Sequence, residues 1–229
     1  GKMWRDTGDG TFSTTTAIKT GLGTLTTDSH FVTGGQESAS RNRKLFTFTN
    51  GSSQIQVLSG DSTTNNAIST PSADWSASGY PTFGIIYQNR LCVMGGSVDK
   101  HRLYFSTIAD HEDFTTSSPP TFSVYPGEGD GILSAYVYRG LLFIFKKPFG
   151  VYVLDGRDPS TANWTLSRFS DAFGVAGPHS ILQILGDLVA GNSNGSYTSL
   201  QASDKFGDFD AGDILQNAKV EEYIRDQLN

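Results

Sequence analysis

An apolar segment that begins at a leucine recurs four times along this chain of 229 residues. It begins at Leu45, Leu91, Leu141 and Leu188, with spacings of 46, 50 and 47 residues. A second apolar segment follows each of these, around Ile55, Leu103, Val151 and Tyr197. Repeats of about 40 to 50 residues that contain several strands are typical of β-propeller blades. This period constrains the fold more strongly than any single motif.

The composition favours strands joined by tight turns, because glycine contributes 26 residues, aromatic residues 12% and charged residues only 17%. We therefore predict an all-β fold, with residues 1–229 forming a single β-propeller domain or a fragment of one. Blades are expected at residues 30–78, 83–126, 131–170 and 178–203, with four strands each except in the last, where no outer strand follows in the expected place. In the first blade, we expect Trp75 in the outer strand. An acidic loop and a short C-terminal helix are expected at residues 204–229, where Val220, Tyr223, Ile224 and Leu228 have helical spacing.

Charge limits the classes of partner. The net charge of −6 argues against a surface that binds nucleic acid throughout, since such a surface needs clustered Lys and Arg. Two basic clusters, Arg41, Arg43 and Lys44 and then Lys146 and Lys147, could still face DNA phosphates if they line a channel. Short charge runs of this kind are also usual at solvated turns and strand ends. No apolar stretch reaches the roughly 18 residues of a membrane-spanning helix.

Two glycine-rich motifs and one acidic cluster suggest chemistry, but the sequence around each does not fit the corresponding site. Gly191–Gly195 matches the nucleophile elbow of serine hydrolases, but no helix is expected after it. Gly127–Gly131 resembles a phosphate-binding loop, but it precedes a strand. The acidic residues Asp204, Asp208, Asp210 and Asp213 lack the glycine and terminal glutamate of an EF-hand loop. We therefore predict no enzyme activity and no catalytic, cofactor-binding or metal-binding residues.

Several segments, in their order and spacing, resemble a known family. The segments are Arg90–Met94, His101–Ser106, Asp110–Thr115, Gly129–Leu133, Arg139–Lys147, Val151–Gly156 and Gly174–Ser180. Over about residues 84–200 the chain resembles the β-propeller hub and nozzle proteins in the tails of short-tailed bacteriophages. The resemblance implies a structural virion protein of the tail or neck, which assembles in the host cytoplasm.

The resemblance also implies partners. Family members form rings around the DNA exit channel, so we expect a homo-oligomeric ring that connects portal, adaptor or fibre proteins and contacts passing DNA non-specifically. These proteins are longer than this chain, which would then be a fragment or a shortened relative. The long loops Thr107–Pro120 and Gly156–Asn163 are the expected contacts with neighbouring subunits. Their candidate contact residues are Asp110, His111, Glu112, Asp113, Arg157 and Asp158.

Two other functions fit parts of the sequence. A carbohydrate-binding propeller for host-surface glycans would use aromatic rings as platforms for sugars, with Tyr80, Phe83, Tyr125 and Trp164 as candidates. A propeller hydrolase would bring together carboxylates from different blades, such as Asp130, Asp155 and Asp171. Core packing explains the aromatic residues equally well, and acidic residues beside glycine are usually turn formers.

Overall fold

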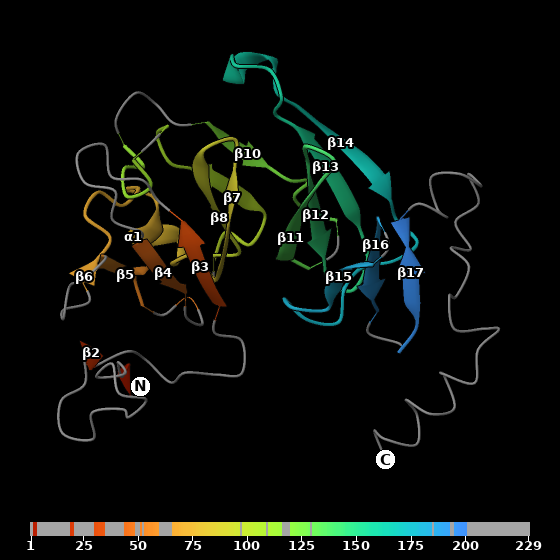
Figure 1. Ribbon diagram of the computed structural model, residues 1–229, viewed down its shortest axis with the longest axis horizontal. Coiled ribbons are helices and arrows are strands. Elements are labelled where there is room, and N and C mark those ends of the chain that lie inside the picture. Colours follow the sequence, from red (N-terminus) through yellow and green to blue (C-terminus); the bar gives the residue numbers. More distant parts are fainter. Residues whose placement is uncertain are drawn as a thin grey trace. The chain divides into compact units, whose positions relative to one another are not determined.

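The computed structural model describes residues 2–3, 19–20, 30–34, 44–48, 51, 53–59, 66–96, 98–108, 110–115, 120–128, 130–184, 186–192 and 195–200. The chain forms two compact units, residues 1–124 and 125–229 (Figure 1). The described residues are dominated by antiparallel strands, so the predicted all-β class is confirmed. Each unit is described separately below.

Two four-stranded sheets make up the first unit. One has the order β3 (His30–Gly34), β4 (Lys44–Phe48), β5 (Gln56–Ser59) and β6 (Asn66–Ala67). The other contains β7 (Phe83–Tyr87), β8 (Arg90–Met94), β9 (Arg102–Phe105) and β10 (Thr121–Ser123), again in chain order. The two-residue strands β1 (Lys2–Met3) and β2 (Lys19–Thr20) pair with each other. Strands that are consecutive in the chain therefore lie side by side in both larger sheets.

The second unit repeats this arrangement. Its first sheet has the order β11 (Ile132–Tyr138), β12 (Leu141–Lys146), β13 (Val151–Asp155) and β14 (Thr165–Ser170), with the 3-10 helix η1 (Thr161–Asn163) before β14. Its second sheet contains β15 (Ile181–Ile184), β16 (Asp187–Gly191) and β17 (Tyr197–Ser199). The four larger sheets of the described residues lie within the segments expected for blades, and the last of them has three described strands.

Two expectations need comment. Trp75 does not belong to an outer strand: it begins the short helix α1 (Trp75–Ser78), and the outer strand is β6. The indole is 1% exposed and packs against the rings of Tyr104 and Phe114, at centroid distances of 5.9 and 4.9 Å. The large side chain of Trp75 therefore packs in the core from a helix and does not indicate a strand. The predicted C-terminal helix lies outside the described residues.

Alternation along the strands builds the core of the first unit. Val32, Phe46 and Val57 are opposite one another across β3, β4 and β5, so their side chains share one face. They are buried together with Leu91 and Val93 of β8. Alternate residues of each sheet thus supply the apolar surface that the neighbouring sheet covers.

The same pattern builds the core of the second unit. Phe145 and Val151, which are paired between β12 and β13, are buried with Ile181, Leu188 and Ala190 from the last sheet. Phe145, Val151, Leu188 and Ala190 are 0% exposed. This core therefore ties the inner strands of one sheet to the inner strands of the next.

Candidate functional site

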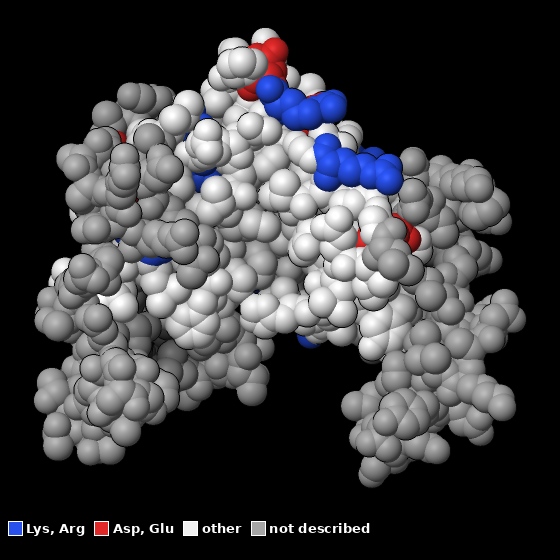
Figure 2. All heavy atoms as spheres, viewed as in Figure 1, with Lys and Arg blue, Asp and Glu red and all other residues white. Residues whose placement is uncertain are grey.

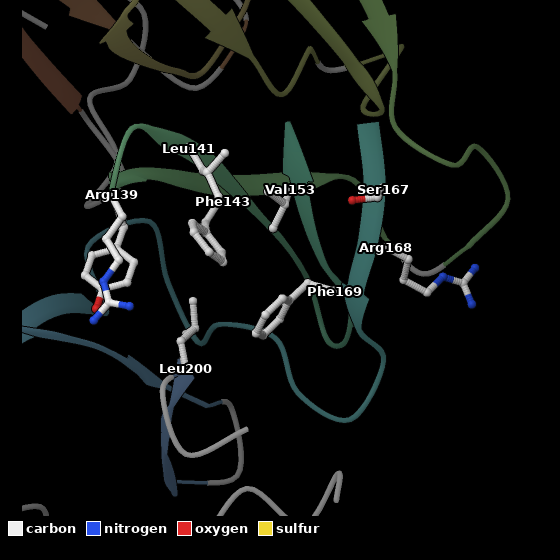
Figure 3. Close-up of a pocket in the computed structure, with 9 residues that line it drawn as sticks. Arg139, Leu141, Phe143, Val153, Ser167, Arg168, Phe169 and Leu200 are labelled. Atoms are coloured by element: carbon white, nitrogen blue, oxygen red, sulfur yellow. The ribbon is translucent and has the colours of Figure 1, made fainter. Parts of the chain in front are cut away.

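A pocket of about 280 Å³ lies in the second unit, beyond the part of the β11–β14 sheet that the last sheet covers. We call it the β17 pocket, because Leu200, the residue directly after β17, forms one of its walls. Its lining residues are Tyr138, Arg139, Leu141, Phe143, Val153, Ser167, Arg168, Phe169 and Leu200. Figure 3 shows Phe143, Val153, Phe169 and Leu200 pointing toward a common space, while Arg168 points away from it.

The floor of the β17 pocket follows from strand register. Phe143 is opposite Val153, and Val153 is opposite Ser167, so these three residues form a row across β12, β13 and β14. Because side chains alternate between the two faces of a strand, the whole row faces the last sheet. In that sheet β17 is the edge strand among the described residues, so the row is covered only in part.

Polar groups border the β17 pocket at one end. The Tyr138 hydroxyl donates a hydrogen bond to the carbonyl oxygen of Gly186, which fixes the ring. The Arg139 guanidinium carbon lies 5.0 Å from the centre of that ring, within the range of a cation–π contact. Arg139 is exposed, and no acidic residue of the described chain pairs with it. The pocket thus combines an apolar floor with the positive charge of Arg139, which no acidic residue of the described ranges neutralises.

A buried lysine organises the opposite face of the same sheet. The Lys146 ammonium is 0% exposed and donates hydrogen bonds to the carbonyl oxygens of Tyr125 and Glu128, at 2.8 and 3.0 Å. It also lies 5.1 Å from the centre of the Tyr152 ring. Burial lowers the pKa of Lys146. Lys146 therefore fastens the segment that leads into β11 onto the sheet.

Acidic and aromatic side chains complete this cluster. The Tyr152 hydroxyl donates to a carboxylate oxygen of Glu128 at 3.1 Å, and Arg168 forms an ion pair with the same carboxylate. Burial, and then the hydrogen bond to Glu128, raise the pKa of Tyr152 to about 12. Tyr152 stacks on Tyr125 with 5.0 Å between ring centroids. These contacts hold Tyr125, Glu128, Tyr152 and Arg168 together in one packed polar cluster.

The loop expected to contact other subunits packs within its own unit instead. The carboxylate of Glu112 accepts from the Lys44 ammonium at 2.5 Å and from the backbone N–H of Ser69 at 3.0 Å. The Lys44 side chain is 6% exposed and the Glu112 side chain is 13% exposed. His111 is also buried, its Nε2 lies 3.1 Å from the Asn89 carbonyl oxygen, and burial lowers its pKa. These residues connect the two sheets of the first unit.

Two acidic residues of this loop have different environments. Asp110 is exposed, whereas the Asp113 carboxylate accepts from the backbone N–H and the hydroxyl of Thr115. Asp113 also bridges to Thr70, beside the first sheet. Among the four candidate contact residues in this loop, Asp110 therefore leaves the most side chain open to a partner.

The loop between β13 and β14 is open to solvent. Arg157 and Asp158 are both exposed. Arg157 pairs with Asp155 through hydrogen bonds of 2.9 and 2.6 Å, and these bonds lower the pKa of Asp155 to about 2. Asp158 accepts from the backbone N–H of Ser160, which keeps the loop turned. A partner protein could reach both residues.

The structure changes the expectation for the basic residues. Lys44 and Lys146 are 5% and 0% exposed and are held by internal acceptors, so their ammonium groups are not accessible to DNA phosphates. Lys147 is exposed, while Arg41 and Arg43 lie outside the described residues. On the face shown in Figure 2, basic side chains of the described residues form small groups beside acidic ones and no continuous band.

Most candidate residues of the two alternative functions are buried or already form ion pairs within the chain. Phe83 and Trp164 are 4% and 7% exposed, and the Trp164 indole donates to the Asp158 carbonyl oxygen. Tyr80 and Tyr125 are half-buried. The carboxylates of Asp155 and Asp171 each pair with an arginine, Arg157 and Arg168, and Asp130 is exposed. The low pKa of Asp155 is opposite to what a general acid needs.

Sequence reasoning did not find the β17 pocket or the cluster around Glu128. The pocket depends on how two sheets meet in space, which no motif records. For Lys146 a signal did exist: it continues the alternation of Leu142 and Ile144, which are both 0% exposed. A lysine in phase with buried residues indicates an internal role.

Two kinds of feature, a metal site and a membrane-spanning helix, are absent from the described part of the chain. There, no group of three or more His, Cys, Asp or Glu side chains could hold a metal ion. No helix in that part has the length and apolar character needed to cross a membrane. The four acidic residues considered for calcium lie outside it. Neither a protein-family model nor a curated protein matches this sequence.

Proposed function

We propose that this chain is a structural assembly module of a bacteriophage tail or neck, a β-propeller or part of one, whose copies form a ring platform for other tail proteins. One observation carries the proposal. In the last sheet, Leu182 and Ile184 share one face of β15 and are 60% and 47% exposed. An apolar outer face favours association with another subunit.

The strand register separates this apolar face from the core of the second unit. Ile181, Leu188 and Ala190 point to the opposite face, where they are buried in the core. Val189, opposite Leu182, is half-buried and extends the outer face. A sheet with two apolar faces needs a neighbour on each side, which is the physical basis of propeller packing.

Buried polar contacts within each unit support the proposal of a rigid platform. In the first unit the buried Lys44–Glu112 pair links its two sheets, and in the second unit Lys146 fixes the segment before β11. The phage assignment itself rests on the resemblance over residues 84–200. A rigid module with an apolar outer face is consistent with that assignment.

Light scattering and electron microscopy of the purified protein test the proposal. We expect ring-shaped oligomers of uniform mass. A Leu182→Asp variant should release smaller species, because it places a charge in the interface. Gln183→Asp is the matched control, since Gln183 is exposed on the same strand but points to the other face. A monodisperse monomer at assembly concentrations, or equal dissociation of both variants, would contradict the ring.

The phage context needs a separate test. Reading frames for portal, capsid or fibre proteins beside the gene are expected, together with labelling of virion tails by an antibody to this chain. A gene among metabolic enzymes, or virions without the protein, would rule out the tail assignment while leaving the oligomer intact.

A further inference from the structure

The loop after β9 places a buried histidine at the junction of the two sheets of the first unit. His111 is 6% exposed, and the centre of its ring lies 6.4 Å from that of Phe46 in β4. Its Nε2 lies 3.1 Å from the carbonyl oxygen of Asn89, in the turn between β7 and β8. One imidazole therefore joins its own loop to both sheets.

The contact with Asn89 fixes where the neutral ring carries its hydrogen. A carbonyl oxygen only accepts hydrogen bonds, so Nε2 is the protonated nitrogen. Nδ1 is buried and has no hydrogen-bond partner among the described residues. A second proton can add only to Nδ1, where no acceptor receives it. The charged ring would then be a buried cation with an unsatisfied donor, which is unfavourable.

Positive charges lie on both elements that pack against His111. Lys44 begins β4, and Arg90 begins β8 directly after Asn89. Burial is the main cause that lowers the pKa of His111, and the Lys44 ammonium lowers this pKa further. The ring of His111 is therefore neutral at neutral pH and resists a second proton.

The carboxylates of the same loop offset these effects only in part. Asp110 raises the pKa of His111, but Asp110 is exposed, so water screens its charge. Glu112 is already paired with Lys44, and Asp113 accepts hydrogen bonds from Thr115. None of the three accepts a hydrogen bond from His111 Nδ1. A protonated His111 is therefore poorly compensated while the loop stays in place.

We infer that His111 makes the attachment of residues 110–115 to the two sheets sensitive to acid, because a proton on Nδ1 shifts this loop from its closed arrangement to an open one. Opening removes Phe114 from the ring of Trp75, which lies 4.9 Å away in the closed loop. The acidic residues of the loop then become available to a partner in mild acid. This inference goes beyond the proposed platform and does not depend on it.

The direction and size of the pH effect follow from the two arrangements. In the open loop His111 regains its ordinary pKa of 6.5, whereas burial lowers the pKa in the closed loop. Above about pH 6.5 the closed loop keeps its full stability. Below that pH only the open loop binds the proton readily, so the ratio of open to closed loop rises by up to about ten-fold per pH unit.

Amide hydrogen exchange of the full chain, measured by mass spectrometry and corrected for intrinsic exchange rates, tests the inference at about pH 7.5 and about pH 5.5. Protection of residues 110–115 should fall by up to about ten-fold in acid, while protection of β12 in the second unit should not change. His111→Gln keeps a donor for Asn89 but does not titrate, so acid should not change its protection. His179→Gln, at an exposed histidine, should behave like the unmodified protein.

Histidine NMR of the unmodified protein gives a second readout that stands even if His111→Gln does not fold. Of the four imidazoles, one should titrate at a lower pH than the exposed His179. Unchanged loop protection in acid, or four titrations at or above the ordinary pKa, would overturn the inference. So would an equal loss of protection in His111→Gln, because the acid response would then belong to another group such as Glu112.

Discussion

Replacing Lys146 by methionine tests whether its ammonium is part of the core or available to a ligand. Methionine keeps much of the side-chain volume but removes both donors, so the carbonyl oxygens of Tyr125 and Glu128 lose their partner. A hydrogen bond to a charged group contributes about 1.5–3 kcal/mol, and relief of the buried charge offsets part of the loss of two such bonds. We expect the free energy of unfolding to fall by about 2–3 kcal/mol, out of a typical total of about 5–15 kcal/mol.

The adjacent residue provides the control. Lys147 is exposed, so Lys147→Met removes the same charge but should change stability by less than about 0.5 kcal/mol. Urea unfolding, followed by tryptophan fluorescence and by circular dichroism, gives both values from the midpoints. Equal changes in the two variants would refute the reasoning. So would a Lys146→Met protein that keeps its stability but loses affinity for DNA, because Lys146 would then be a ligand contact.

Three further predictions concern the same fold. Gly174→Ala should lower the free energy of unfolding by at least about 2 kcal/mol, because the added Cβ would lie within 3 Å of two backbone carbonyl oxygens. Gly177 has open space around it, so Gly177→Ala should leave that free energy unchanged. Thermal unfolding measures both variants. The pKa of Tyr152 lies at about 12, above its ordinary 10, so its stabilising contribution is complete below pH 10 and disappears as the pH rises to 12. Between pH 10 and pH 12 the free energy of unfolding should fall by up to about 1.4 kcal/mol per pH unit because of Tyr152, and Tyr152→Phe should remove this fall. Urea unfolding at a series of alkaline pH values measures the slope. Cys92 is fully buried and burial raises its pKa, so a thiol reagent should label it only after unfolding; rapid labelling of the native protein would show that this core opens.

Strands were predictable where turn chemistry and apolar segments agree. Within the predicted blade 131–170, the apolar segments 132–138 and 141–146 are separated by Arg139 and Gly140; they form β11 and β12, and the two residues between them form the turn, with φ angles of 51° and 77°. Positive φ at both central residues matches the twist of a tight hairpin. By contrast β6 has only two residues, Asn66 and Ala67, which are both exposed and carry no alternating pattern. Its position depends on pairing with β5 and could not be predicted locally.

The site was harder to predict because it depends on what is near in space. Lys44 and Glu112 are adjacent in the fold but belong to separate parts of the sequence, and each looks like a solvated charge when considered alone. The β17 pocket lies beside the last sheet, in which three strands are described, and it is lined in part by the half-buried side chains of Val153 and Phe169. Neither arrangement has a sequence motif, since both result from how completed sheets meet.

The separation of Lys44 and Glu112 has a consequence for synthesis on the ribosome. Glu112 is added 68 residues after Lys44, so this ion pair can form only after translation has reached the loop that carries Glu112. The contact between β4 and that loop should therefore be completed late, when the last part of the first unit emerges from the ribosome.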